Sequence, residues 1–332
     1  MNISSSSKSE NGNHDSLTCW VVTDGSAGME NQCIGLGEAM GLTPVIKRIK
    51  TKKPWRWLPP QLWLSPLDKL NAEGDPLTPP WPDILITCGR QAIPMSMAIR
   101  KASKGETFTV HIQTPNAHIS NFDLIVVPEH DTLRGPNVLV SRGSLTRINY
   151  QKLTEAVSEF KHKLGNLPSP IFTVLIGGPN KCYNVNADTM KSLCTRLEAL
   201  HAQHGGHFLV TTSRRTGREN EAILKETLSR LPHTLWDGNG PNPYFAYLGK
   251  ADAIIVTADS VNMVCEAATA GKPVFVFELP GGNRKFNFFH NEMRKAGYTK
   301  PFDGQLEFWT PPPLDETNRI AKKVTALWKQ PK

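Results

Sequence analysis

The stretch Ala253–Phe277, AIIVTADSVNMVCEAATAGKPVFVF, predicts a strand, a helix and a second strand in close succession. Its apolar, β-branched start is typical of a buried parallel strand, and residues 257–260 (TADS) supply side chains that cap the start of a helix. Apolar residues then recur at helical spacing until Gly271 and Pro273, which end the helix before the apolar run Val274–Phe277. Such a unit belongs to an open α/β sheet, where ligands bind at the carboxyl ends of the strands.

The start of the predicted helix is suited to bind an anion. Its first backbone N–H groups lack an intrahelical acceptor, and the helix dipole favours negative charge there. Asp259 and Ser260 stand at this start, and Glu266 lies about two turns further on, roughly 10 Å along the axis. Asn262 and Glu266 share one face of the predicted helix. We therefore predict that a diphosphate binds at the helix start, beside Asp259 and Ser260, and that a ribose binds at Glu266. A solvated, purely structural Glu266 fits the pattern equally well.

Strands and helices alternate along the rest of the chain, which predicts an α/β fold. Residues 165–170 (GNLPSP) interrupt the alternation with a glycine and two prolines and mark the expected domain boundary. We predict two Rossmann-like parallel-sheet domains, over residues 16–165 and 166–312, that face a cleft. A disordered tail is expected over residues 1–15 and a C-terminal helix over 313–332.

The composition indicates a globular protein. Of the 332 residues, 20% are charged and 39% hydrophobic, and the net charge of +8 permits an acidic partner. No nucleic-acid motif accompanies this charge, so we predict no nucleic-acid partner. The chain has no apolar run long enough to cross a membrane, no apolar signal segment near its start, and six scattered cysteines. We therefore predict a cytoplasmic protein with free thiols, no metal and no cofactor.

Polar or glycine-rich loops follow the predicted strands of the second half. Gly177 and Gly178 would let the backbone approach a ligand closely. Ser213, Arg214 and Arg215 put a hydroxyl and two guanidiniums at a strand end, which suits a diphosphate. Arginines in a solvated turn are the ordinary alternative, but the neighbouring loops favour a donor site that includes Gly177, Gly178, Ser213 and Arg214.

In the first half, residues 24–28 (DGSAG) loosely resemble a phosphate loop, but neither G-x-G-x-x-G nor G-x-x-x-x-G-K-[ST] occurs in the chain. This argues against a P-loop NTPase and against a standard dinucleotide site. Asp24 or His118 is the candidate general base for an acceptor, although such residues are more often ordinary loop side chains. The predicted acceptor side of the cleft comprises Gly25, Ser26, Asn31, Gln32, Gly89, Arg90 and Gln113.

One segment suggests contact with a membrane surface. The cations of residues 47–53 (KRIKTKK) precede Trp55, Trp57 and Trp63, with leucines between them. Clustered cations beside tryptophan and leucine suit an interfacial segment on anionic lipid. A basic loop that leads into a core-packed aromatic helix explains the pattern equally well.

Several blocks of sequence carry a family resemblance: DG at 24–25, GMENQCIGL at 28–36, CGR at 88–90, IQTP at 112–115, NPY at 242–244, VTADSV at 256–261 and GKPV at 271–274. Together they resemble the mitochondrial-fission "elongated mitochondria" proteins of plants and their bacterial relatives. The resemblance spans residues 18–312, and the blocks at 31–32 and 257–260 are the most specific. A compact segment over 65–82 and an N-terminus nearly free of arginine make the chain similar to the bacterial members.

The resemblance implies a fold similar to that of GT-B glycosyltransferases. It also implies sugar transfer, with which the bacterial members are associated, or recruitment of a dynamin-like fission protein, in which the plant members are implicated. GT-B transfer typically needs no bound metal, in agreement with the lack of a D-x-D triplet.

We therefore expect a metal-independent glycosyltransferase that moves a sugar from a nucleoside-diphosphate sugar to a cell-envelope acceptor at the inner face of a membrane. The sequence does not define the sugar, the base, the acceptor or the stereochemical outcome. One alternative is a non-catalytic adaptor of the same fold that recruits a protein partner. The other is a nucleotide-sugar epimerase that does not use NAD, which would need paired carboxylates and a histidine in the cleft.

Overall fold

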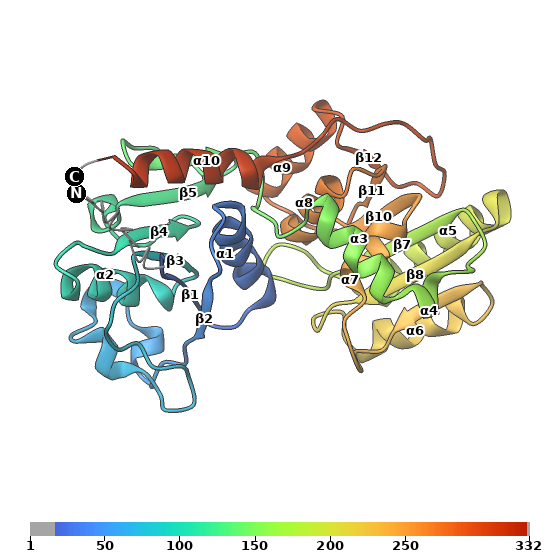
Figure 1. Ribbon diagram of the computed structural model, residues 1–332. Helices are drawn as coiled ribbons and strands as arrows, with labels where there is room; N and C mark the ends of the chain where they lie inside the picture. The colour runs from blue at the N-terminus through green and yellow to red at the C-terminus, as the bar shows by residue number, and fades with distance from the viewer. Residues whose placement is uncertain (1–16, 331–332) are drawn as a thin grey trace, which may run out of the picture.

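The computed structural model describes residues 17–330 and contains two α/β units, each built on a six-stranded sheet with helices on its faces (Figure 1). Every pair of neighbouring strands in both sheets is parallel. The α/β class and the two Rossmann-like units expected from the sequence are therefore confirmed.

The first unit holds the N-terminal sheet. From edge to edge its strands are β2 (Val45–Arg48), β1 (Cys19–Thr23), β3 (Ile84–Cys88), β4 (Phe108–Ile112), β5 (Leu124–Pro128) and β6 (Val138–Ser141). Its helices are α1 (Ala27–Ala39), α2 (Ala92–Ala102) and α10 (Glu316–Trp328), and its 3-10 turns are η1 (Trp55–Trp57), η2 (Pro60–Leu62), η3 (Pro66–Lys69) and η4 (Ile119–Asn121). The order of the strands reverses between β1 and β3.

The second unit repeats this plan. Its strands, from edge to edge, are β12 (Thr299–Pro301), β11 (Val274–Phe277), β10 (Ala253–Thr257), β7 (Ile171–Ile176), β8 (His207–Thr212) and β9 (His233–Trp236). Its helices are α3 (Tyr150–Glu159), α4 (Lys161–Leu164), α5 (Ala187–His204), α6 (Arg218–Leu228), α7 (Tyr244–Lys250), α8 (Val261–Thr269) and α9 (Arg284–Lys295). Here the order reverses between β7 and β10, where open α/β sheets bind their ligands.

The quoted stretch forms β10, α8 and β11, as predicted. All residues of β10 are buried because the strand lies inside the sheet, between β11 and β7. The Met263 N–H donates to the Ser260 hydroxyl at 3.4 Å, so Ser260 caps α8. Gly271, just after the helix, has a φ of +72°, a conformation that glycine adopts at little cost. The start of α8 thus lies directly at the carboxyl end of β10.

The chain passes between the two units twice. After β6, helix α3 packs against α7, and Leu153 joins the hydrophobic core of the second unit. After β12, helix α10 returns to the first unit, where Ile320 and Val324 are buried in the core beside α1 (Figure 1). Packing therefore places residues 150–164 with the second unit, before the proline-rich break at 165–170. It also places the last helix within the first unit, not as a separate element.

Hydrogen bonds join the two crossing segments to each other. The Thr146 N–H donates to the Thr317 hydroxyl at 2.8 Å, and that hydroxyl donates back to the Thr146 carbonyl at 3.0 Å. The Arg142 N–H donates to Glu316 at 2.7 Å nearby. Both connections between the units therefore run side by side.

Three elements lack a strong signal in the sequence and were not expected. The edge strand β2 (VIKR) is half charged, β12 (TKP) is very short, and α9 (RKFNFFHNEMRK) is mostly polar. The tail expected over residues 1–15 lies outside the described residues. Between residues 17 and 330, no helix is both long and apolar enough to cross a membrane.

Candidate functional site

Asp259 lies where the strand order of the second sheet reverses, and its side chain is fully buried. Its carboxylate accepts hydrogen bonds from the Gly178 N–H at 3.0 Å, the Thr257 hydroxyl at 2.7 Å and the Arg215 guanidinium at 2.9 Å. Gly177 leaves room for it, since a Cβ there would lie 2.2 Å from both carboxylate oxygens. The backbone and side-chain donors that suit a phosphate therefore already hold a carboxylate.

Arg215, and not Arg214, reaches this carboxylate. The Arg215 guanidinium also donates to the Gly178 carbonyl at 3.0 Å and so ties the loop after β8 to the loop after β7. Arg214 and Ser213 instead line a separate pocket of about 350 Å³ that also includes Trp236. The sequence pattern pointed to an arginine in this loop, but it could not tell which of two adjacent side chains turns toward the sheet.

Glu266 is buried on α8 and is held by groups from both units. The Tyr244 hydroxyl, at the start of α7, donates to its carboxylate at 2.7 Å, and the Asn31 side chain of α1 adds a hydrogen bond from the first unit. Burial raises the pKa of Glu266 to about 7, and the hydrogen bonds from Tyr244 and Asn31 oppose this shift only in part. Glu266 can therefore gain or lose a proton close to neutral pH.

The carboxyl ends of the two sheets face each other and touch. A Cβ on Gly28 of α1 would lie 2.2 Å from the Asn262 side-chain nitrogen of α8. The Gln32 side chain donates to Asn262 Oδ1 at 3.3 Å, and Lys285 of α9 pairs with Asp131, after β5, at 2.7 Å. The predicted residues that meet across this interface are Asn31, Gln32, Asn262 and Glu266.

Asp24 lies at the corresponding reversal of the first sheet, between the ends of β1 and β3. Its carboxylate accepts hydrogen bonds from the Ser26 N–H at 3.1 Å and the Gln91 side chain at 3.3 Å. Gly25 and Gly89, in the two adjoining turns, have φ values of +80° and +88°, which favour glycine. Asp24 itself is exposed, so its carboxylate is accessible from solvent at this edge of the sheet.

Three other residues predicted for the acceptor side have different surroundings. Arg90 donates to the Trp57 carbonyl at 3.0 Å. His118 is exposed and caps η4 by accepting from the Ser120 N–H at 3.4 Å. Gln113, at the end of β4, has a φ of +81°, an unusual conformation for a residue with a Cβ. Within the described chain, the hydrogen-bond partners of Arg90 and His118 all belong to the first unit.

The three tryptophans of the predicted membrane segment occupy different environments. Trp63 is only 7% exposed and packs in the core of the first unit, edge to face with Trp55 at 6.1 Å between ring centroids. Trp55 is half-buried beneath Lys69, whose Nζ lies 4.9 Å from the ring centroid. Trp57 is 64% exposed. Of the three side chains Trp57 is thus the exposed one, whereas Trp63 fills the space beneath the η turns.

Two histidines near the interface, the buried His290 and the half-buried His130, were not singled out from the sequence, because no spacing links them to the motifs. His290 of α9 hydrogen-bonds through Nε2 to the Ala258 carbonyl at 2.8 Å, one residue before Asp259. His130, after β5, packs its ring on Phe289 with centroids 5.7 Å apart. Burial lowers the pKa of both histidines. In the part of the chain that the structure describes, no three His, Cys, Asp or Glu side chains gather to hold a metal ion.

Comparisons with known proteins give consistent matches over most of the chain. The family model described as "Mitochondrial fission ELM1" matches residues 27–328. Mitochondrial fission protein ELM1 of Arabidopsis thaliana is 31% identical over 269 residues, which cover 73% of this chain and 63% of the plant protein. An uncharacterized protein of Rickettsia prowazekii (strain Madrid E) is 26% identical over 350 residues, 93% of this chain and 98% of that protein. The chain thus spans less than two thirds of the plant relative.

A solved structure supports the architecture. The UDP-GlcNAc 2-epimerase from Methanocaldococcus jannaschii is similar with a TM-score of 0.53 over 93% of this chain and 99% of that chain, at 11% sequence identity. At this identity the similarity concerns the fold alone. Two Rossmann-like units whose sheets face each other at their carboxyl ends form the GT-B fold, as the sequence resemblance implied.

Proposed function

The chain belongs to the mitochondrial fission ELM1 family, and on this premise we propose that it is a glycosyltransferase with a nucleoside-diphosphate sugar as donor. The donor's diphosphate would lie between the ends of β7 and β10, and its ribose at Glu266. The acceptor, a component of the cell envelope, would lie on the first unit beside Asp24. The surroundings of Asp259 support this proposal most directly.

Those surroundings stabilise one negative charge inside the protein. Gly178 offers a backbone N–H, Arg215 a guanidinium, and α8 its N-terminus, and each of these groups is a phosphate ligand in other proteins. A diphosphate would take the place of the Asp259 carboxylate and bring more negative charge to the same donors. The same groups would stabilise the diphosphate as it leaves during sugar transfer.

The acceptor would bind to the first unit. Asp24 is an exposed carboxylate at the reversal of the first sheet, which suits a general base for an acceptor hydroxyl. A ribose at Glu266 would replace the hydrogen bonds of Tyr244 and Asn31, and the latter comes from the first unit. Donor binding would therefore loosen the contact between the units. Peripheral membrane association through Trp57 and the cations of residues 47–53 would bring the acceptor close.

A non-catalytic adaptor is the second candidate, and one observation favours it. Asp259 and Glu266 are both buried and already satisfied by partners within the chain, as in a structural core. A protein that uses the fold only as a scaffold would have no need to release either carboxylate. Recruitment of a partner protein would then depend on its surface.

Nucleotide binding separates the two candidates. We would measure thermal unfolding of the wild type, Asp259→Asn, Arg215→Ala and the control Arg230→Ala with UDP, GDP, ADP, CMP and their sugars. A nucleotide at 100 times its Kd should stabilise the wild type by roughly 2.7 kcal/mol. Asp259→Asn should bind the same nucleotide on the order of tenfold more tightly, because a like charge is removed from the site. Arg215→Ala should lose the shift, whereas Arg230→Ala, at an exposed ion pair with Glu198, should keep it.

The outcome decides between the candidates. If no nucleotide shifts the wild type or Asp259→Asn, the donor site is refuted and the adaptor stands. If a nucleotide sugar binds, its turnover in the presence of membrane extract, and the loss of that turnover in Asp24→Asn, test the transferase step.

A further inference from the structure

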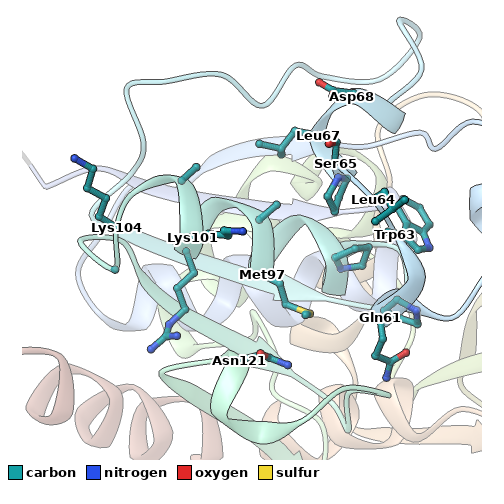
Figure 2. A pocket seen from close by; sticks show the side chains of 17 residues that line it. Gln61, Trp63, Leu64, Ser65, Leu67, Asp68, Met97, Lys101, Lys104 and Asn121 are labelled. Carbon is teal, nitrogen blue, oxygen red and sulfur yellow. The ribbon is translucent and has the colours of Figure 1, made fainter.

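A groove of about 1150 Å³ lies on the first unit, between α2 and the segment that carries η2 and η3. Figure 2 shows Met97 within it, Trp63 and Leu64 toward one end, and Lys104 at the opposite end. Small-ligand cavities in proteins measure roughly 300–1,000 Å³, so this groove is large enough for an extended molecule.

The walls of the groove combine apolar and polar side chains, and apolar ones stand on both walls. Pro94, Met97, Ala98 and Lys101 line it from α2, at the i, i+3, i+4 and i+7 spacing of one helix face. Met97 and Ala98 are only half-buried, so the facing segment does not cover this part of the helix face completely. Leu64, which is 76% exposed, lines the other wall together with Leu67 and Trp63. These side chains form an apolar strip along the groove, which also carries polar lining residues, among them Gln61, Ser65 and Asn121.

The groove carries positive charge at one end. Lys101 and Lys104 are exposed there, and within residues 17–330 neither ammonium group has an ion-pair partner. Arg100 beside them is paired with Asp123 at 3.0 Å. On the opposite wall Asp68 is the acidic lining residue. An apolar strip that ends at two free cations is complementary to a molecule with a hydrocarbon chain and an anionic head.

We propose that this groove binds the hydrocarbon chain of an anionic membrane lipid, with the lipid phosphate held between Lys101 and Lys104. The exposed Leu62 (60%) and Leu64 extend the apolar rim toward a bilayer surface, and Trp57 stands on the neighbouring turn. The site therefore anchors the first unit to one lipid, in addition to any general attraction by surface charge.

This lipid is distinct from the acceptor. Helix α2 starts at the carboxyl end of β3 and runs back along the sheet, so Lys101 and Lys104 lie at the end remote from the second unit. A phosphate held there faces away from Asp24 and Asp259. The inference does not rest on the proposed donor site and can fail or succeed independently of it.

Chain-length dependence tests the apolar part of the site. Octyl, decyl and dodecyl phosphate, each below its micelle concentration, would be titrated into the wild type by calorimetry. Each added methylene should tighten binding roughly two- to fourfold, since a fully buried CH₂ contributes about 0.8 kcal/mol. An affinity that does not change with chain length would refute binding of the hydrocarbon chain in the groove. Met97→Ala should flatten the dependence while the melting temperature shows that the protein is still folded.

Charge reversal tests the head-group part. Lys101→Glu combined with Lys104→Glu should weaken dodecyl phosphate binding at least on the order of tenfold and leave uncharged dodecyl maltoside, itself a weak ligand, unaffected. The matched control, Lys322→Glu with Lys323→Glu on the exposed face of α10, makes the same change in net charge and should bind as the wild type does. An equal loss of dodecyl phosphate affinity in both double variants would show that net charge alone explains the binding, and would overturn the proposal.

Two further measurements fix the source and the place of the ligand. The wild type should sediment with phosphatidylglycerol vesicles and not with phosphatidylcholine vesicles, and the Lys101/Lys104 variant should bind the anionic vesicles more weakly than the Lys322/Lys323 variant does. Alkyl phosphate binding without vesicle binding would overturn the assignment to a membrane lipid. Arg215→Ala should bind dodecyl phosphate unchanged, whereas a loss would place the ligand in the donor site and refute the groove.

Discussion

At the scale of single residues, the second unit buries two carboxylates in contrasting ways. Asp259 has a cation, Arg215, among its three donors, so its charge is balanced within the fold. Glu266 has only neutral donors, from Tyr244 and Asn31, and pays the full desolvation of an ionised group. The arrangement around Glu266 favours a carboxyl that titrates close to neutral pH.

The pH dependence of stability should reveal Glu266. The unfolded chain ionises this group near pH 4.5, but the folded protein ionises it only near pH 7, so the folded form binds more protons between these values. Stability should therefore fall as pH rises through this window, by roughly 3 kcal/mol in total. Glu266→Gln, which keeps an acceptor for Tyr244, should remove that fall. Thermal unfolding at about pH 5 and about pH 8 checks it, and parallel curves for the two proteins would contradict it.

The sequence revealed the positions of these carboxylates but not their partners. Asp259 could be placed just before the helix and Glu266 within it, because capping residues and helical spacing are local properties. Their partners Arg215, Tyr244 and Asn31 come from other elements, and only the packed fold brings them within hydrogen-bond distance. The roles proposed for both carboxylates in donor binding remain predictions.

At the scale of elements, local sequence patterns determine where helices and strands begin and end, whereas tertiary contacts determine what they pack against. The sequence predicts strands at 171–176, 207–212, 233–236 and 274–277 and a helix at 187–204. These bounds agree with β7, β8, β9, β11 and α5, because apolar runs there are bounded by glycine, proline or capping residues. The sequence of α9 is mostly polar, so it gives no clear helical signal, although Phe289 and Met293 form a buried face of this helix. For α10, the spacing of Ile320 and Val324 indicates a buried face but not the unit that buries it.

The attachment of α10 gives an energetic prediction. Ile320 is fully buried in the core of the first unit, so Ile320→Ala should destabilise that unit by about 2–5 kcal/mol through lost apolar burial and a residual cavity. Hydrogen exchange would show the loss in β1, β3 and α1 and leave β7 and β10 protected. Lys322→Ala, on the exposed face of the same helix, should change stability by less than about 0.5 kcal/mol. Equal loss of protection in both sheets would contradict the packing described here.

At the scale of the whole molecule, the two units are in contact across the edges that would have to separate to admit a ligand. The contacts include the hydrogen bonds of Gln32 to Asn262 and of Asn31 to Glu266, and the close approach of Gly28 to Asn262. Two ion pairs, Lys285 with Asp131 and Lys152 with Glu38, also join the units. The connections between the units also run side by side, through Thr146 and Thr317. Such an interface is consistent with hinge opening.

A bulky residue at Gly28 should hold the units apart. Because even a Cβ there would meet Asn262 at 2.2 Å, Gly28→Leu should increase the radius of gyration measured by small-angle X-ray scattering. Ala27→Leu, one residue earlier on the same helix and exposed, is the matched control and should scatter as the wild type does. An unchanged radius in Gly28→Leu, with the protein folded, would show that the interface adapts without opening.

The return of α10 to the first unit also sets an order for biosynthesis. A ribosome completes every strand of the first sheet early, yet the residues Ile320 and Val324 that close its core emerge only after the entire second unit has been made. Domains usually fold in the order of their synthesis, from the N-terminus onward. In this chain the second unit can finish first, while the nascent first sheet waits with an uncovered apolar surface. Until Ile320 and Val324 leave the ribosome, this apolar surface is open to contact with other chains or with a chaperone.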